Sequence, residues 1–140
     1  MRRILLSAAA ISSFLVLTSA GCKHDNNNIV TPDTPGNTTG KWTVTMYLDD
    51  GRNEASDFSG YSFEFGNSGS MTAEKNGQVT AGSWAENMND GLQKFRITLN
   101  TSDNKLSKLN HNWVIQVKNE TEIDLRDDDP SGEELHFTRQ

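Results

Sequence analysis

The sequence predicts an all-β protein, a small eight-stranded up-and-down antiparallel β-barrel that follows a signal peptide and a flexible tether. Short runs of alternating apolar and polar residues recur from residue 40 onward, which is typical of half-buried strands. Turn residues separate these runs, and no stretch after Cys22 has the length and period of an ordinary helix. We assign residues 1–21 to the signal peptide, 22–39 to the tether and 40–140 to the barrel domain.

The first twenty-one residues have the features of an export signal. A basic start precedes an uncharged apolar run over residues 4–20, shorter than the ~20 residues of a membrane-spanning helix. Small residues at 19–21 then precede Cys22, the only cysteine, and this arrangement resembles the lipobox of bacterial lipoproteins. The resemblance implies that Cys22 is acylated and anchors the chain to the membrane. The expected location is the bacterial cell envelope, as an outer-membrane lipoprotein on the periplasmic face or the cell surface.

The tether and the charge of the chain limit the partners. Residues 22–39 are rich in Asn, Thr, Pro and Gly and offer only Ile29 and Val30 for burial, so we expect them to be flexible. Without Arg2 and Arg3 the mature chain has eleven Lys and Arg against nineteen Asp and Glu, a formal charge of −8. Such an acidic chain gains nothing from counterion release on DNA or RNA, so nucleic acid is not an expected partner.

Residues 40–48 are the first expected strand, with Met46 on its apolar face and Tyr47 on its polar face. A long polar connection over residues 49–60 follows, and its one large apolar residue is Phe58. Residues 61–65 then alternate again and form the second expected strand.

The third and fourth expected strands are joined by the strongest hairpin signal in the chain. Residues 71–75 and 78–81 flank Asn76-Gly77, a dipeptide that favours the tight turns of two-residue hairpins.

A glycine interrupts the fourth strand. Gly82 is expected to form a bulge or bend that brings Trp84 to the inner face together with Val79 and Ala81. Residues 86–93 are then expected to be a polar loop.

The second half of the domain continues the meander. Residues 94–99 form the fifth expected strand, and Leu106 and Leu109 in the following connection are spaced like one helical turn that covers an end of the sheet. The last three strands are expected over residues 113–117, 123–125 and 135–137.

Five motifs, in this order, resemble the small lipocalin-like domains of Bacteroidetes-type lipoproteins, which have a calycin-like barrel. The resemblance covers residues 40–139 and implies a non-enzymatic binding protein for a small apolar ligand or lipid, with residues 49–60 as a lid. It also implies that Arg139 stacks on the first tryptophan of the barrel. The motifs are Gly40-x-Trp42, Gly60-Tyr61-x-Phe63-x-Phe65, Gly82-x-Trp84, Leu109-Asn110-x-x-Trp113 and Leu135-x-Phe137.

The large side chains on the expected inner face line a ligand cavity or fill the core. An eight-stranded barrel is either filled by side chains or holds one small ligand. Each aromatic side chain buries ~150–250 Å², which favours the filled core. A filled barrel would instead bind a protein or glycan through residues 49–60, 86–93 and 100–112. The candidate lining or core residues are Trp42, Met46, Phe58, Tyr61, Phe63, Phe65, Trp84, Phe95, Trp113 and Phe137.

No residue pattern predicts an enzyme or a cofactor. His24 lies in the tether, and no Ser or Cys beside His111 or His136 forms a recognisable nucleophile motif. The sequence identifies no protein partner.

One acidic stretch is similar to the start of a calcium loop. Asp127, Asp129 and Ser131 have the spacing of the first ligands of an EF-hand, but the twelfth position is Thr138, where that loop needs a glutamate. These three residues are a weak calcium candidate, and we expect a solvated acidic turn and no metal site.

Overall fold

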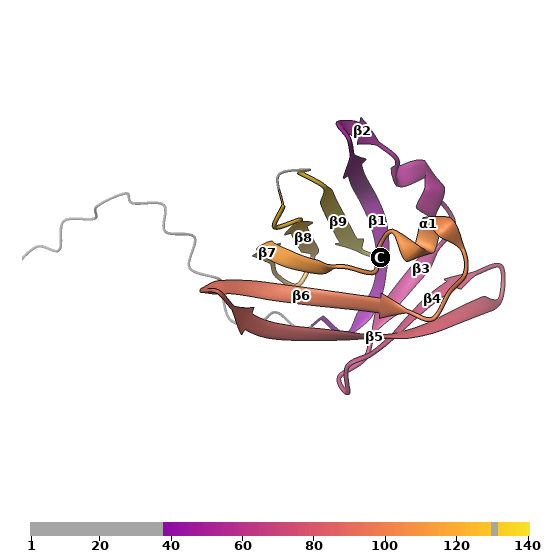
Figure 1. Ribbon diagram of the computed structural model, residues 1–140. Coiled ribbons are helices and arrows are strands. Elements are labelled where there is room, and N and C mark those ends of the chain that lie inside the picture. The colour runs from indigo at the N-terminus through magenta and orange to yellow at the C-terminus, as the bar shows by residue number, and fades with distance from the viewer. Residues whose placement is uncertain (1–37, 130–131) are drawn as a thin grey trace, which may run out of the picture.

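The computed structural model describes residues 38–129 and 132–140, and its strands form one antiparallel barrel (Figure 1). The signal peptide and most of the tether lie outside the described residues. Eight strands make the wall of the barrel: β1 (Gly40–Asp49), β3 (Ser62–Phe65), β4 (Ser70–Lys75), β5 (Gln78–Asn89), β6 (Leu92–Leu99), β7 (Asn112–Lys118), β8 (Glu122–Arg126) and β9 (Glu134–Arg139).

The strands follow one another around the barrel in chain order, apart from a two-residue strand, β2 (Arg52–Asn53), which pairs with the last two residues of β1. β1 closes the barrel because it pairs with β3 on one side and with β9 on the other. The β1–β9 ladder runs from Trp42 opposite Arg139 to Leu48 opposite Glu134. The predicted eight-stranded up-and-down barrel is therefore confirmed.

The tight turns are made by pairs of residues in the left-handed backbone region. Asn76 and Gly77 have φ values of 53° and 76°, as their sequence predicts. Asp90 and Gly91 adopt the same conformation, with φ values of 51° and 77°. The expected polar loop over residues 86–93 is wrong for this reason: β5 and β6 continue through it as a long hairpin.

A β-bulge changes the faces of β1. Val44 lies opposite Phe137 and Met46 lies opposite His136, so Thr45 is an extra residue in the ladder. Tyr47 is consequently buried, with 1% of its surface exposed, while Met46 is only half-buried. The predicted faces of these two residues are therefore wrong after Val44.

The expected bulge at Gly82 is also wrong. β5 keeps a regular register through Gly82 with both β4 and β6. Val79 and Ala81 face outward, whereas Trp84 is half-buried on the inner face, in phase with Gly82. A Cβ atom on Gly82 would lie 2.2 Å from the carbonyl oxygen of Thr98, so the glycine allows close approach of β6.

Aromatic rings fill the centre of the barrel, and the ring of Phe65 is their common partner. Phe65 is fully buried and lies edge-on to Phe95 and Phe137, with ring centroids 5.4 Å apart in both pairs. The centroid of its ring also lies 5.8 Å from that of Trp84 and 6.4 Å from that of Trp42. Seven of the ten predicted core or lining residues are buried, and the three half-buried ones are Met46, Tyr61 and Trp84.

Phe65→Ala should remove the ring that four others contact and lower the free energy of unfolding by ~3–5 kcal/mol. The measurement is urea unfolding monitored by tryptophan fluorescence. Val79→Ala is the matched control, because Val79 is 61% exposed, and it should change the free energy by less than about 0.5 kcal/mol. A Phe65→Ala effect as small as that of the control would contradict a ring-filled core.

Candidate functional site

Two short helices cover the end of the barrel where a ligand was expected to enter. The 3-10 helix η1 (Ala55–Phe58) buries Phe58, whose ring lies edge-on to Tyr47 at 5.4 Å. The predicted helical turn is α1 (Asn104–Ser107), and it buries Leu106 and the following Leu109. Asp103 caps this turn by accepting hydrogen bonds from the backbone amides at residues 105 and 106.

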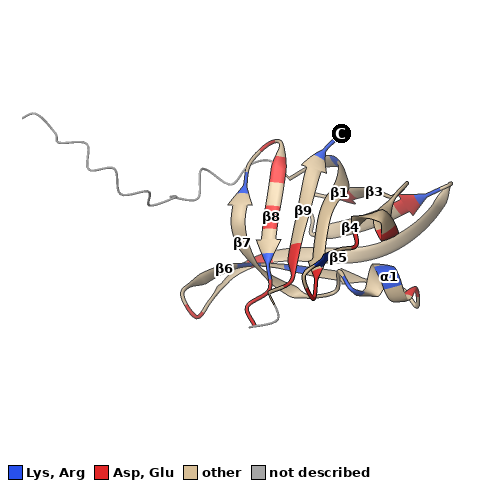
Figure 2. Ribbon diagram, turned by 90° about the horizontal axis from the view of Figure 1, so that it is seen from above, with Lys and Arg blue, Asp and Glu red and all other residues tan. Residues whose placement is uncertain are grey.

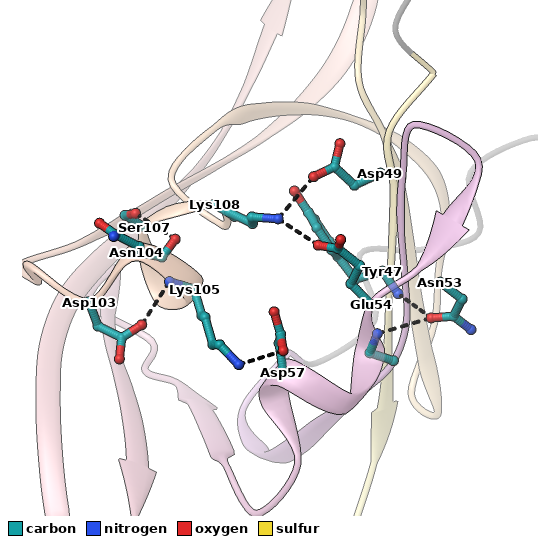
Figure 3. A network of polar contacts seen from close by, with 11 residues as sticks. Tyr47, Asp49, Asn53, Glu54, Asp57, Asp103, Asn104, Lys105, Ser107 and Lys108 are labelled. Atoms are coloured by element: carbon teal, nitrogen blue, oxygen red, sulfur yellow. Dashed lines mark hydrogen bonds and ion pairs between the residues drawn. The ribbon is translucent and has the colours of Figure 1, made fainter.

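Ion pairs hold this cover in place (Figure 3). Lys108 donates hydrogen bonds to Asp49 at 3.0 Å and to Glu54 at 2.5 Å, and Lys105 donates one to Asp57 at 2.6 Å. The hydrogen bonds to Glu54 and Asp49 raise the pKa of Lys108 above its ordinary value, so its charge persists. Residues 49–60 are therefore linked to α1 across the barrel end.

The opposite end is closed by Arg139. Its guanidinium lies 4.6 Å from the ring centroid of Trp42, which confirms the predicted stacking. Arg139 also donates hydrogen bonds to the backbone oxygens of Thr39, at 2.6 Å, and Glu120. A Cβ atom on Gly40 would lie 2.6 Å from the guanidinium, which explains the glycine of the G-x-W motif.

A groove in the barrel wall is the candidate binding site. β6 and β7 pair over only three residue pairs, from Arg96 opposite Asn112 to Lys94 opposite Val114, and then separate. Figure 2 shows the two strands leaving this region in different directions. The groove beside this point has a volume of about 220 Å³ and is lined by Glu86, Asn87, Met88, Gln93, Lys94 and Ile115. Four of these lie in the 86–93 segment that was named as a candidate binding loop.

Charged and apolar groups meet in this groove. Lys118 lies opposite the buried Ile123, so it belongs to the inner face of β7, and it donates a hydrogen bond of 2.5 Å to Glu86. This ion pair connects β5 and β7 beyond the point where β6 and β7 separate. Met88, at the rim, is 65% exposed and is one of the most exposed large apolar residues of the described chain.

Lys94 is a groove residue that the sequence did not indicate as part of a site. It is buried, with 1% of its surface exposed, and it donates a hydrogen bond to Asp128 of the β8–β9 loop. Neither this pair nor the Lys118–Glu86 pair has a local sequence signal, because each joins residues more than thirty positions apart.

The structure describes two residues of the weak calcium candidate, Asp127 and Asp129. Asp127 is buried and lies 2.6 Å from Nε2 of His111, while Ser131 lies outside the described residues. Burial alone would raise the pKa of Asp127, but the hydrogen bonds from His111 and the Asp128 amide lower it below its ordinary value. Across residues 38–129 and 132–140, no group of three or more His, Cys, Asp or Glu side chains is arranged to hold a metal ion.

Membrane contact was expected through Cys22, which lies outside the described residues. In the part of the chain that the structure describes, both helices are four residues long and neither could cross a bilayer.

Comparison with known proteins identifies the fold. A DUF4847 family protein from Bacteroides vulgatus has a TM-score of 0.54 and 11% identity, over 74% of this chain and 94% of that chain. A lipocalin-like protein from Bacteroides uniformis has a TM-score of 0.50 and 16% identity, over 75% of this chain and 100% of that chain. No protein-family model and no curated protein matches the sequence. The domain is a lipocalin-like barrel, as its motifs indicated.

Acidic residues gather where the β8–β9 loop meets the end of β1, and one of them provides a pH test (Figure 2). Burial, followed by the charges of Asp49 and Asp127, raises the pKa of the Glu133 carboxyl above its ordinary value. Between the two pKa values the folded state binds more protons than the unfolded state, so the free energy of unfolding falls as pH rises through this window. Glu133→Gln should therefore stabilise the protein at pH 7.

Thermal unfolding from pH 3 to pH 8 measures this effect. The gain in melting temperature from Glu133→Gln should be present at pH 7 and disappear below the ordinary carboxyl pKa of about 4.3. Glu64→Gln, at an exposed position on β3, should show no such pH dependence. The same pH dependence of the melting temperature in both variants would contradict a raised pKa at Glu133.

Proposed function

We propose that this chain is a non-enzymatic binding module of the bacterial cell envelope, anchored through an acylated Cys22, and that its ligand site is the groove between β6 and β7. The packing of aromatic rings around Phe65 carries this proposal. These rings occupy the space that a ligand inside the barrel would need. The lipocalin-like fold supports a binding role, and the groove supplies a site for it outside the filled centre.

The size of the groove indicates the size of the bound group. Pockets for drug-sized ligands have volumes of ~300–1,000 Å³, and an apolar cavity of ~150 Å³ holds one benzene ring. The groove, at about 220 Å³, therefore matches one large side chain or a group of similar size. This favours a surface module over a carrier that encloses a whole lipid.

The described start of the chain fits an anchored module. Thr39 is bonded to Arg139 at the end of the barrel opposite the helical cover. Residues 22–37 precede this point, and sixteen residues reach at most about 50 Å when fully extended at ~3.3 Å per residue. The negative charge of the mature chain opposes contact with anionic headgroups, so an acyl chain on Cys22 would supply the attachment.

Native mass spectrometry of the protein purified gently from envelopes tests the site. Met88→Asp places a charge at the groove rim and should reduce an added ligand mass at least tenfold. Val79→Asp is the matched control, because Val79 is similarly exposed on another hairpin, and it should retain the mass. If the Met88→Asp protein retained the same ligand mass, the ligand would bind elsewhere than in the groove.

Cys22→Ala tests the anchor. Cells grown with a clickable palmitate analogue should label the wild-type protein and leave the Cys22→Ala protein unlabelled, since no other cysteine is present. Lys23→Ala is the neighbouring control and should be labelled like the wild type. An unlabelled wild-type protein would contradict acylation.

A further inference from the structure

We infer that the groove takes an extended peptide segment of a partner protein, which adds as a strand along β7 and places one large apolar side chain in the groove. This inference rests on the proposed binding role of the same site and names the ligand class. It follows from the unpaired backbone edges beside the groove, from a bulge in β7 and from the side chains at the rim.

Strands β6 and β7 have unpaired edges beside the groove, whose lining residues come from β5, β6 and β7. Among the described residues, β7 from Ile115 to Lys118 pairs with β8 but has no pairing with β6. Likewise, Leu92 and Gln93 of β6 pair with β5 alone. Such edges present backbone N–H and C=O groups that another strand can bond. The barrel is thus closed at β1 but open along part of its β6–β7 seam.

A bulge coincides with this opening. The β7–β8 register shifts between Ile115 and Val117, directly after the last residue of β7 that pairs with β6. Bulges bend a strand, increase its twist and interrupt its pairing, and they are common beside functional sites. The bulge therefore accounts for the separation of β7 from β6, and the Lys118–Glu86 ion pair stabilises the separated arrangement.

The chemistry of the groove favours a peptide over the other ligand classes. A lipid tail would leave the edge N–H and C=O groups without partners. A sugar ring is commonly bound on an aromatic face, and none of the six lining residues is aromatic. An extended peptide bonds the edge and directs alternate side chains to the same face. Met88 and Ile115 supply apolar contacts for one such side chain, which the volume accommodates.

The test uses the mature chain carrying Cys22→Ser and a panel of capped heptapeptides that alternate threonine and valine, with phenylalanine, leucine, methionine or valine at the centre. Two methylated versions of each peptide carry N-methyl groups on alternate residues, so that each version blocks one backbone edge. Amide shifts and amide hydrogen exchange are measured by NMR. At least one peptide should shift and protect amides of residues 92–93 and 115–118.

Backbone pairing with β7 predicts at least a tenfold loss of affinity for the methylated version that blocks the paired edge, because each hydrogen bond lost weakens binding several-fold. Loss for both versions would place the peptide between β6 and β7. Met88→Asp should weaken binding of the unmethylated peptide, and Val79→Asp should not.

Other outcomes overturn the inference. Absence of binding across the panel, methylated versions that bind as tightly as the unmethylated peptide, or shifts confined to another surface would exclude strand addition. Protection of residues 115–118 without peptide, lost when residues 23–37 are removed, would identify the chain's own tether as the occupant. Dependence of that protection on protein concentration would identify a second copy. If a bound small molecule is lost in the Met88→Asp protein and no peptide binds, the groove remains the binding site. The inference that it binds a peptide is then wrong.

Discussion

The closure of the sheet by β1 is the constraint on which the rest of the structure depends. Because β1 pairs with both β3 and β9, the inner face of every strand must share one enclosed volume. The rings around Phe65 fill that volume, the two short helices cover one end, and Arg139 with Trp42 covers the other. The binding role that we propose is therefore assigned to the wall of the barrel, where β6 and β7 separate.

The fold could be predicted because its signals are local. Alternation with a period of two identifies the strands, and dipeptides such as Asn76-Gly77 adopt the left-handed turn without help from distant residues. The bulge at Thr45 has no such signal, since the apolar Met46 continues the alternation of Trp42 and Val44 past the inserted residue. The faces after Val44 therefore required the structure, and so did the continuation of β5 and β6 through residues 86–93.

The sequence could predict one segment of the candidate site but not the groove itself. Residues 86–93 were identified because they are polar and were expected to form a loop, but a groove needs a second wall, and Ile115 of β7 lies more than twenty positions beyond Gln93. The ion pairs of Lys94 and Lys118 depend on the same long-range geometry. Burial of Lys94 also contradicts the usual exposure of lysine, which composition alone cannot anticipate.

The filled centre separates the residues that fold this barrel from most of those at the proposed binding groove. A protein that folds around its ligand gains stability from the bound state and cannot change the site without changing the fold. Here the apolar contacts of the core involve neither Met88 nor the Lys118–Glu86 pair. Substitutions at Met88 or at this ion pair therefore leave the core contacts intact, whereas Ile115, which also lines the groove, packs against the core. The rim of the groove can therefore change in sequence while the core is kept, and the solved neighbours share this fold at 11% and 16% identity.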